Sequence, residues 1–164
     1  MIRKILVTAS AALACVALAS CSAIQDALDS SDGPDRDDAG QITEAADIGV
    51  MSMKAGDCFN SADLGTMISE VPGVPCSEPH DAEVTLVYNS PAASYQDMDA
   101  EAQESCEAAM ADYVGANWES YEPMIEWSLI APTSGGWAQG DHEIICIAYA
   151  NGPDLTESLK DVAG

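Results

Sequence analysis

The residue types best suited to catalysis gather in one short stretch, Val74–Val84, which contains a serine, a histidine and an aspartate. Ser77, His80 and Asp81 are the kinds of group that a nucleophilic enzyme uses as nucleophile, base and orienting acid. Such close neighbours in sequence rarely reach the geometry of a triad. We therefore expect His80 to hydrogen-bond a turn or to contact a binding partner. A wall-active enzyme or regulator with His80 in its site is the alternative.

Other catalytic patterns are missing from the sequence. The Gly-x-Ser-x-Gly element that presents a nucleophilic serine does not occur, and the chain has only two histidines, His80 and His142. No pair of carboxylates suited to glycoside chemistry stands out among the 28 acidic residues. We therefore expect a protein that is not an enzyme and that has no catalytic residues, no cofactor and no metal site.

Four cysteines, Cys58, Cys76, Cys106 and Cys146, lie well beyond the N-terminal segment. An even number of cysteines in a chain with an export signal predicts disulfides. Three pairings are possible. We favour Cys58–Cys76, which closes a short loop, together with Cys106–Cys146, which joins a helix to a central strand. The alternative is a zinc site that uses these cysteines with either histidine, but the sequence contains no Cys-x-x-Cys pair.

Tryptophans are the remaining candidates for contact with a ligand. Trp118 and Trp137 interrupt segments rich in turn residues, where an indole ring could stack on a glycan or a protein partner. The alternative is a structural role, in which Trp127 lies in the core and Trp137 covers the end of a hairpin.

The elements that must position these residues are three strands and one helix. The runs 83–88, 124–131 and 142–149 are rich in β-branched and aromatic residues, which favours strands, and the last two form an antiparallel hairpin. A further edge strand is expected at 48–53. After Ser94, one helical face carries small and apolar residues at i, i+4, i+7, i+8, i+11 and i+12, namely Ala102, Cys106, Ala109, Met110, Tyr113 and Val114. The fold class is therefore α+β: a small antiparallel sheet with one main helix packed across it and two disulfides.

The N-terminus has the layout of an export signal. Arg3 and Lys4 precede an apolar run that ends at Ala19, so residues 1–20 are expected to be a signal peptide. Leu18-Ala19-Ser20-Cys21 resembles a bacterial lipobox, in which the cysteine receives the lipid and becomes the mature N-terminus. We expect lipidation of Cys21, and cleavage after Ala19 to release a soluble protein is the alternative.

The segment 21–47 is acidic and contains few large apolar residues, so it predicts a flexible tether. A calcium site is the alternative, although the spacing of its aspartates is not that of a calcium-binding loop. A folded domain is expected at 48–152 and a short polar tail at 153–164. The net charge is −23, and removal of the signal leaves three basic residues against 28 acidic ones. This charge disfavours nucleic acid as a partner and repels anionic membranes and wall polymers.

Three elements of the sequence carry a resemblance to a known family. They are Gly56-Asp57-Cys58-Phe59, the stretch Val74–Val84, and Trp137–His142 followed by Cys146. Together with Cys106 they resemble the actinobacterial septum-formation domain over roughly residues 50–150. That family usually has Gly-Asp-Arg where this chain has Gly140-Asp141-His142.

The resemblance implies an exported or membrane-anchored envelope protein linked to cell division, and it supplies no catalytic mechanism. We therefore expect a lipoprotein on the extracytoplasmic face of the cell membrane. Its partners would be the membrane, through the lipid on Cys21, and an envelope or division protein or a wall polymer.

Overall fold

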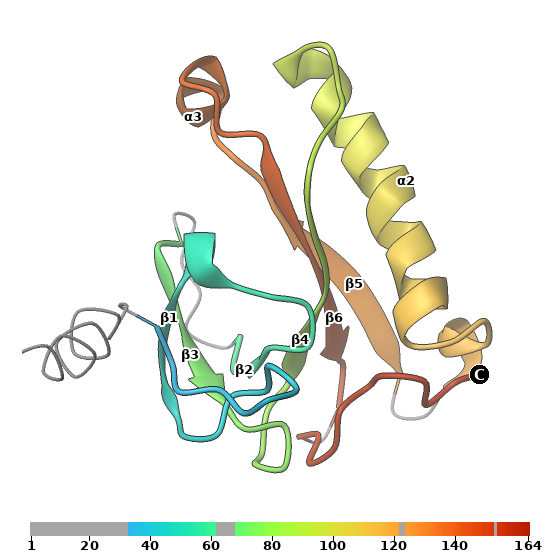
Figure 1. Cartoon of the computed structure of the whole chain (residues 1–164). Coiled ribbons are helices and arrows are strands. Elements are labelled where there is room, and N and C mark those ends of the chain that lie inside the picture. The colour runs from blue at the N-terminus through green and yellow to red at the C-terminus, as the bar shows by residue number, and fades with distance from the viewer. Residues whose placement is uncertain (1–32, 62–67, 122–123, 153) are drawn as a thin grey trace, which may run out of the picture. The chain divides into compact units, whose positions relative to one another are not determined.

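The computed structural model describes residues 33–61, 68–121, 124–152 and 154–164. Within these residues six antiparallel strands form one sheet in the order β1-β3-β2-β4-β6-β5. The strands are β1 (Ala46–Gly49), β2 (Cys58–Phe59), β3 (Glu70–Val74), β4 (Ala82–Asn89), β5 (Ile125–Ile130) and β6 (Glu143–Ala150). The helices are α2 (Tyr95–Tyr113), the short α3 (Ser134–Ala138) and two single 3-10 turns, η1 (Val50–Ser52) and η2 (Trp118–Ser120). The predicted α+β fold is confirmed (Figure 1).

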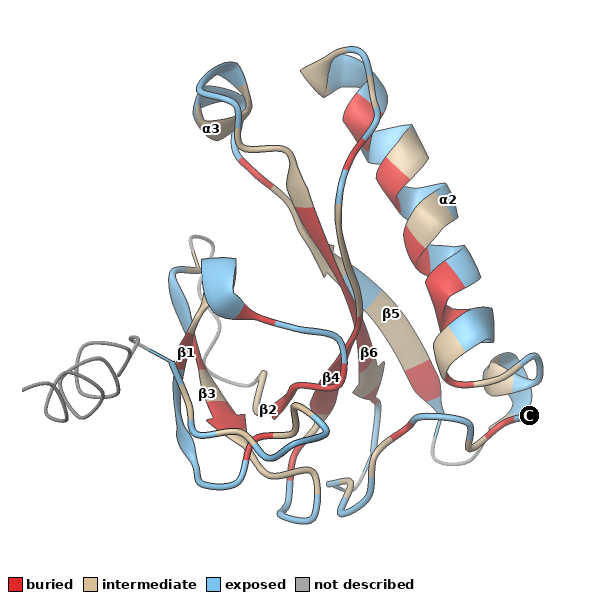
Figure 2. Ribbon diagram, viewed as in Figure 1, coloured by how far each residue is buried: buried red, intermediate tan, exposed pale blue. Residues whose placement is uncertain are grey.

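Helix α2 covers one face of the sheet over β4, β6 and β5 (Figure 1). Its buried residues form the stripe that the sequence predicts, and Met98 extends it by one turn toward the N-terminus. The stripe faces the sheet, whereas the acidic residues of α2 other than the half-buried Glu101 are exposed (Figure 2). The disulfide Cys106–Cys146 links this stripe to β6, with the two Cα atoms 5.2 Å apart. The predicted pairing of helix and central strand is therefore confirmed.

The helix begins after Ser94, but not with the hydrogen bond of a capping box. The Ser94 hydroxyl donates to Asp97 Oδ2 at 2.6 Å rather than accepting from a backbone N–H. At the other end, Gly115 follows the last turn with a φ of +123°, as expected for a residue that terminates a helix.

Strand β4 departs from simple alternation at Thr85. Its pairing with β6 shifts by one residue between Val84 and Leu86, which is a β-bulge. The sequence predicts Val84 and Leu86 on one face, whereas in the structure Val84 packs in the core opposite α2 and Leu86 in the core under α2. The prediction is wrong because one extra residue reverses the facing of every later side chain.

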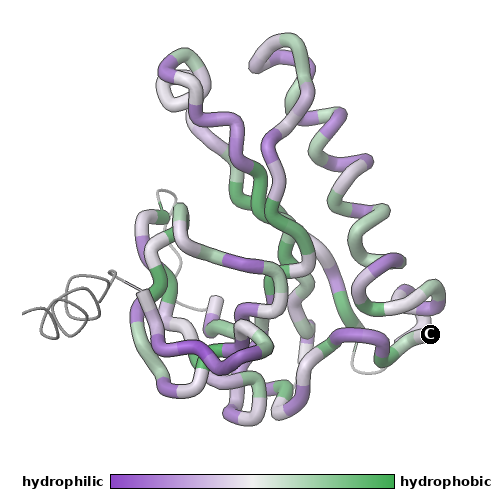
Figure 3. The backbone as a smooth tube through the Cα atoms, viewed as in Figure 1, coloured by the Kyte–Doolittle hydropathy of each residue, from purple (hydrophilic) through white to green (hydrophobic). Residues whose placement is uncertain are grey.

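The second face of the sheet is covered by its own first strands. Ile48 of β1 and Val71 of β3 pack against Phe59, Val84 and Ile145 in one apolar cluster. The hydropathy-coloured tube shows this apolar material concentrated where β4 and β6 cross the centre (Figure 3). The local disulfide Cys58–Cys76 is present, as predicted, and joins the first residue of β2 to the loop after β3.

The folded domain begins earlier than the sequence predicts. Within the range expected to be tether, Ile42 is buried and β1 already starts at Ala46. Arg36 forms a two-pronged ion pair with Asp57, a carboxylate that is 1% exposed, and its Nη2–Oδ2 distance is 2.9 Å. Arg36 is one of only three basic residues after the signal, so the sequence pattern gave no reason to expect it to anchor an acidic segment.

The C-terminal segment is also part of the domain rather than a free tail. Leu155 and His80 exchange two backbone hydrogen bonds, of 3.0 and 2.7 Å. Leu159 and Ala163 are buried against the C-terminal end of α2, in a cluster with Met110. Isolated apolar residues in a short segment after a turn give no periodic signal. The docking of the C-terminal segment could therefore not be predicted.

Gly115 allows the C-terminal segment to approach α2 closely. A Cβ atom at this position would lie 2.3 Å from the backbone carbon of Ala163, and the positive φ adds strain for any other residue. We expect Gly115→Ala to lower the free energy of unfolding by about 2–4 kcal/mol, measured by urea denaturation. Gly140→Ala is the control, because its φ is also positive, at +94°, but a Cβ there has no atom within 4 Å. Equal losses for the two variants would contradict the proposed contact.

Candidate functional site

His80 lies inside the protein rather than on its rim. The residue is 0% exposed, and its Nδ1 lies 2.8 Å from the carbonyl oxygen of Glu78. Because a carbonyl only accepts, Nδ1 carries the proton, and Nε2 has no hydrogen-bond partner among the described residues. Its backbone also bridges to Leu155. His80 therefore stabilises the turn before β4, and in this conformation it cannot touch a substrate or partner outside the domain.

The other polar residues of the same stretch also serve the fold. Asp81 accepts hydrogen bonds from the backbone N–H and the hydroxyl of Ser61, at 2.6 and 2.9 Å. Ser77 is exposed, whereas His80 is fully buried. The structure therefore does not bring Ser77, His80 and Asp81 together as a catalytic group.

Glu83 is a fully buried carboxylate that the sequence analysis did not single out. It accepts three hydrogen bonds of 2.6 Å each, from the hydroxyls of Tyr113 and Ser158 and from the backbone N–H of Leu159. Burial and the Glu83 carboxylate raise the pKa of Tyr113, so the phenol remains a donor at neutral pH.

Glu83 also lies beside two sulfur atoms, in an arrangement that resembles a metal site. Its carboxylate and the sulfurs of Cys58 and Cys76 lie within 4.8 Å of one another. The two sulfurs are bonded to each other, however, so neither is available as a thiolate ligand. This cluster holds the C-terminal segment to the sheet.

The two candidate tryptophans lie at opposite ends of α2. Trp137, in α3, stacks on His142 with ring centroids 4.0 Å apart, and its edge meets Tyr95 in the first turn of α2. Trp118 lies beyond the last turn and packs against the apolar cluster that contains Val114. A helix of 19 residues is about 28 Å long, so the two rings do not form one stacking surface. Trp137 covers the end of the β5–β6 hairpin.

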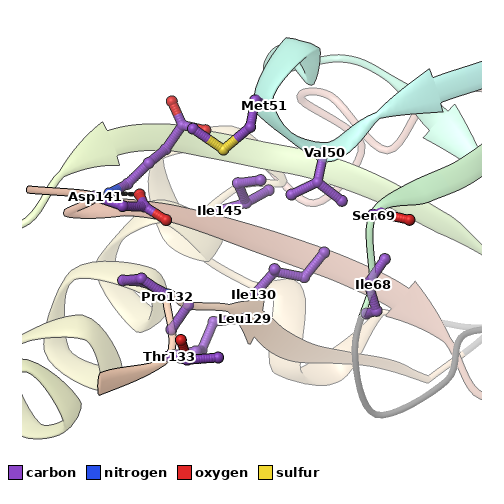
Figure 4. A pocket seen from close by; sticks show the side chains of 12 residues that line it. Val50, Met51, Ile68, Ser69, Leu129, Ile130, Pro132, Thr133, Asp141 and Ile145 are labelled. Atoms are coloured by element: carbon purple, nitrogen blue, oxygen red, sulfur yellow. Dashed lines mark hydrogen bonds between the residues drawn. The ribbon is translucent and has the colours of Figure 1, made fainter. Parts of the chain in front are cut away.

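A trough with a volume of about 640 Å³ lies between η1, the residues just before β3 and the end of the β5–β6 hairpin (Figure 4). Most of its lining is apolar. The lining residues are Val50, Met51, Ile68, Ser69, Leu129, Ile130, Ala131, Pro132, Thr133, Asp141, Glu143 and Ile145. Ile130 of β5 and Ile145 of β6 supply the sheet side, and Val50 and Met51 of η1 lie across from them (Figure 4). This is a size typical of ligand sites in proteins, and we name it the trough.

Two carboxylates mark one end of the trough. Asp141 Oδ1 accepts a hydrogen bond of 3.2 Å from the backbone N–H of Glu143. Partial burial and the negative charge of Asp141 raise the pKa of the Glu143 carboxyl. Among the described residues the single ion pair is Arg36–Asp57, so neither carboxylate has a counter-charge there.

Sequence reasoning missed the trough because its walls come from four separate segments. Asp141 does belong to the third element of the family resemblance, Trp137–His142, and that element forms this end of the hairpin. His142 stands at the position where the family usually has arginine, and its ring stacks on that of Trp137. The Gly140-Asp141 turn before β6 was therefore the one feature of the sequence that pointed to the trough.

Several predictions concern residues outside the described part of the chain. The signal at 1–20, the lipidated Cys21 and the tether up to residue 32 belong to this group. Among the described residues, no helix has the length and apolar character needed to cross a membrane.

The chain was compared with protein families, curated proteins and solved structures. No curated protein and no solved structure gives a significant match. A family model described as septum formation matches residues 25–156. This range includes all three sequence elements that suggested the resemblance, the buried Glu83 and the whole trough. Since the match covers well over half of the sequence, the chain belongs to the septum-formation family.

Proposed function

We propose that this chain is an extracytoplasmic lipoprotein that binds a protein partner during septum formation, and that it does so without catalysing a reaction. Membership of the septum-formation family supports a role in cell division. The observation that carries the binding function is the trough, an open site of about 640 Å³ with a mostly aliphatic lining. Apolar surface of this kind is typical of sites for protein or ligand contact.

The burial of His80 supports binding over catalysis. The enzyme hypothesis needs His80 to meet a substrate, yet its ring is fully enclosed and lies at the start of β4. The trough lies at the opposite end of the β4–β6 pair, where Glu143 of β6 pairs with Asn89 at the end of β4. The histidine and the open site are therefore not parts of one catalytic centre.

A lipid on Cys21 would hold the domain close to the membrane. Gly33, the first described residue, lies only 12 positions after Cys21, and a fully extended chain of this length spans at most about 40 Å. The acidic domain would be repelled by anionic lipids, so the lipid would act as a tether while the domain surface stays available to a partner.

Replacing the proposed lipidation site should alter the processing of the signal and the membrane retention of the protein. We expect Cys21→Ala to keep its signal or to appear in the soluble fraction, whereas the unaltered chain sediments with membranes and incorporates a radiolabelled fatty acid. Cys15→Ala is the matched control, because Cys15 lies within the apolar run and would be removed with the signal. A fully processed Cys21→Ala protein that remains in the membrane fraction would argue against lipid anchoring.

The role in division is tested by localisation. A fluorescent fusion of the full chain should concentrate at the septum of dividing cells, and depletion of the protein should lengthen cells. A uniform envelope signal with normal cell length would contradict the septal role.

A further inference from the structure

We infer that the trough binds an extended segment of a protein partner that combines aliphatic side chains with a lysine or arginine beside them. This inference rests on the proposed function, because it gives the chemistry of the partner that the domain would recognise. Three separate features of the trough support it: its lining, its charge and the strand edge along which it runs.

The lining calls for aliphatic side chains. The apolar residues that line the trough differ in exposure. Val50 and Ile130 are half-buried, Ile145 is buried, and Met51 is 68% exposed. Met51 is one of two large hydrophobic residues with such exposure among those described. A methionine on the rim of an apolar site adapts its shape to a bound side chain. Burial of this surface would provide the main favourable term for binding.

The charge calls for a basic residue at one end. Asp141 and Glu143 both line this end of the trough, and neither forms an ion pair among the described residues. Partial burial and, after it, repulsion by the charge of Asp141 raise the pKa of the Glu143 carboxyl. A lysine or arginine placed between them would remove this repulsion. The chain outside the signal has three basic residues against 28 acidic ones, so the wider electric field also attracts a cationic segment and repels anionic lipids and wall polymers.

The backbone calls for an extended segment. Leu129 and Ile130 point to opposite faces of β5, one toward the core under α2 and the other toward the core on the far side. Both nevertheless line the trough, together with Ala131, so the trough follows the edge of the sheet at the end of β5. Strand β5 pairs only with β6 among the described strands. An extended segment could therefore add to this edge through backbone hydrogen bonds and place alternate side chains in the trough.

The test uses the mature lipidated chain held in nanodiscs of phosphatidylcholine, a lipid without net charge. A library of random 12-residue peptides on phage is selected against these discs after removal of phage that bind empty discs. We expect the selected peptides to share aliphatic residues at alternate positions next to a lysine or arginine. Fluorescein-labelled versions are then titrated with the discs and binding is measured by anisotropy.

Variants of the protein and of the peptide separate the three features. We expect Asp141→Asn with Glu143→Gln to weaken binding roughly tenfold, which corresponds to about 1.4 kcal/mol, and Ile130→Asp to abolish it. The control Glu104→Gln with Glu107→Gln makes the same charge change on the exposed side of α2 and should alter affinity less than about twofold. N-methylation of alternate peptide bonds should abolish binding, and the melting temperature of each variant is measured to confirm folding.

Several outcomes would overturn the inference. These are no enrichment over empty discs, selected peptides that lack basic residues, or binding that the trough variants leave unchanged. Association of two copies of the mature chain through the trough, seen by sedimentation and lost in Ile130→Asp, would also overturn it in favour of a homodimer. A failed selection alongside normal septal localisation would reject this partner chemistry alone, whereas loss of septal localisation would reject the proposed function.

Discussion

Replacing Glu83 with alanine is expected to lower the free energy of unfolding by about 3–5 kcal/mol, the largest effect of any single substitution considered for this chain. The carboxylate is 0% exposed and accepts hydrogen bonds from Tyr113, Ser158 and Leu159. Alanine would leave three donors without an acceptor and would open a cavity between β4 and the C-terminal segment. Urea denaturation followed by tryptophan fluorescence measures the loss.

Two further variants identify the cause of that loss. Glu83→Gln keeps one acceptor oxygen but turns an amide group toward donors, so we expect a smaller loss of about 1–3 kcal/mol. Glu107→Ala removes a carboxylate from the exposed side of α2 and should change stability by no more than about 0.5 kcal/mol. Hydrogen exchange should also show faster exchange at the Leu159 amide in Glu83→Ala. An unchanged Leu159 amide in a destabilised variant would show that Glu83 does not hold the C-terminal segment.

Removal of the Cys106–Cys146 disulfide should produce the second large effect. We expect Cys106→Ala with Cys146→Ala to lower the free energy of unfolding by about 4 kcal/mol, because the bond closes a loop with a sequence separation of 40 residues. The bond Cys58–Cys76 closes a loop with a sequence separation of 18 residues. By the same relation, Cys58→Ala with Cys76→Ala should lower the free energy of unfolding by about 3 kcal/mol. The change is measured by denaturation of the mature chain under non-reducing conditions.

Mass spectrometry provides a direct check on both bonds. Reduction of the unfolded mature chain should add the mass of four hydrogen atoms, two for each disulfide. Four free thiols together with one equivalent of zinc in the purified protein would overturn both disulfides in favour of the metal site considered as the alternative. Intact disulfides with no loss of stability in the Cys106→Ala and Cys146→Ala variant would instead contradict the role of that bond in joining α2 to the sheet.

The sequence by itself determined those features that depend on local patterns. The helix face around Cys106 follows from spacing at 3.6 residues per turn, and the β5–β6 hairpin follows from two apolar runs separated by turn residues. The pairing of the four cysteines followed once that helix face and the central strand had been recognised. The family could be recognised from three short elements for the same reason, since each element forms a turn or strand end with fixed local geometry.

Only the tertiary structure decided where residues without a local pattern would lie. The bulge at Thr85 reversed the facing of later β4 residues, and it can be seen only in the pairing of β4 with β6. Arg36 pairs with Asp57, 21 positions away, and Glu83 pairs with Leu159, 76 positions away. Their contacts depend on how distant segments dock, and sequence periodicity carries no information about docking. The candidate site moved for the same reason, from the conspicuous His80, which the fold buries, to the trough beside Asp141, whose walls are brought together from four segments.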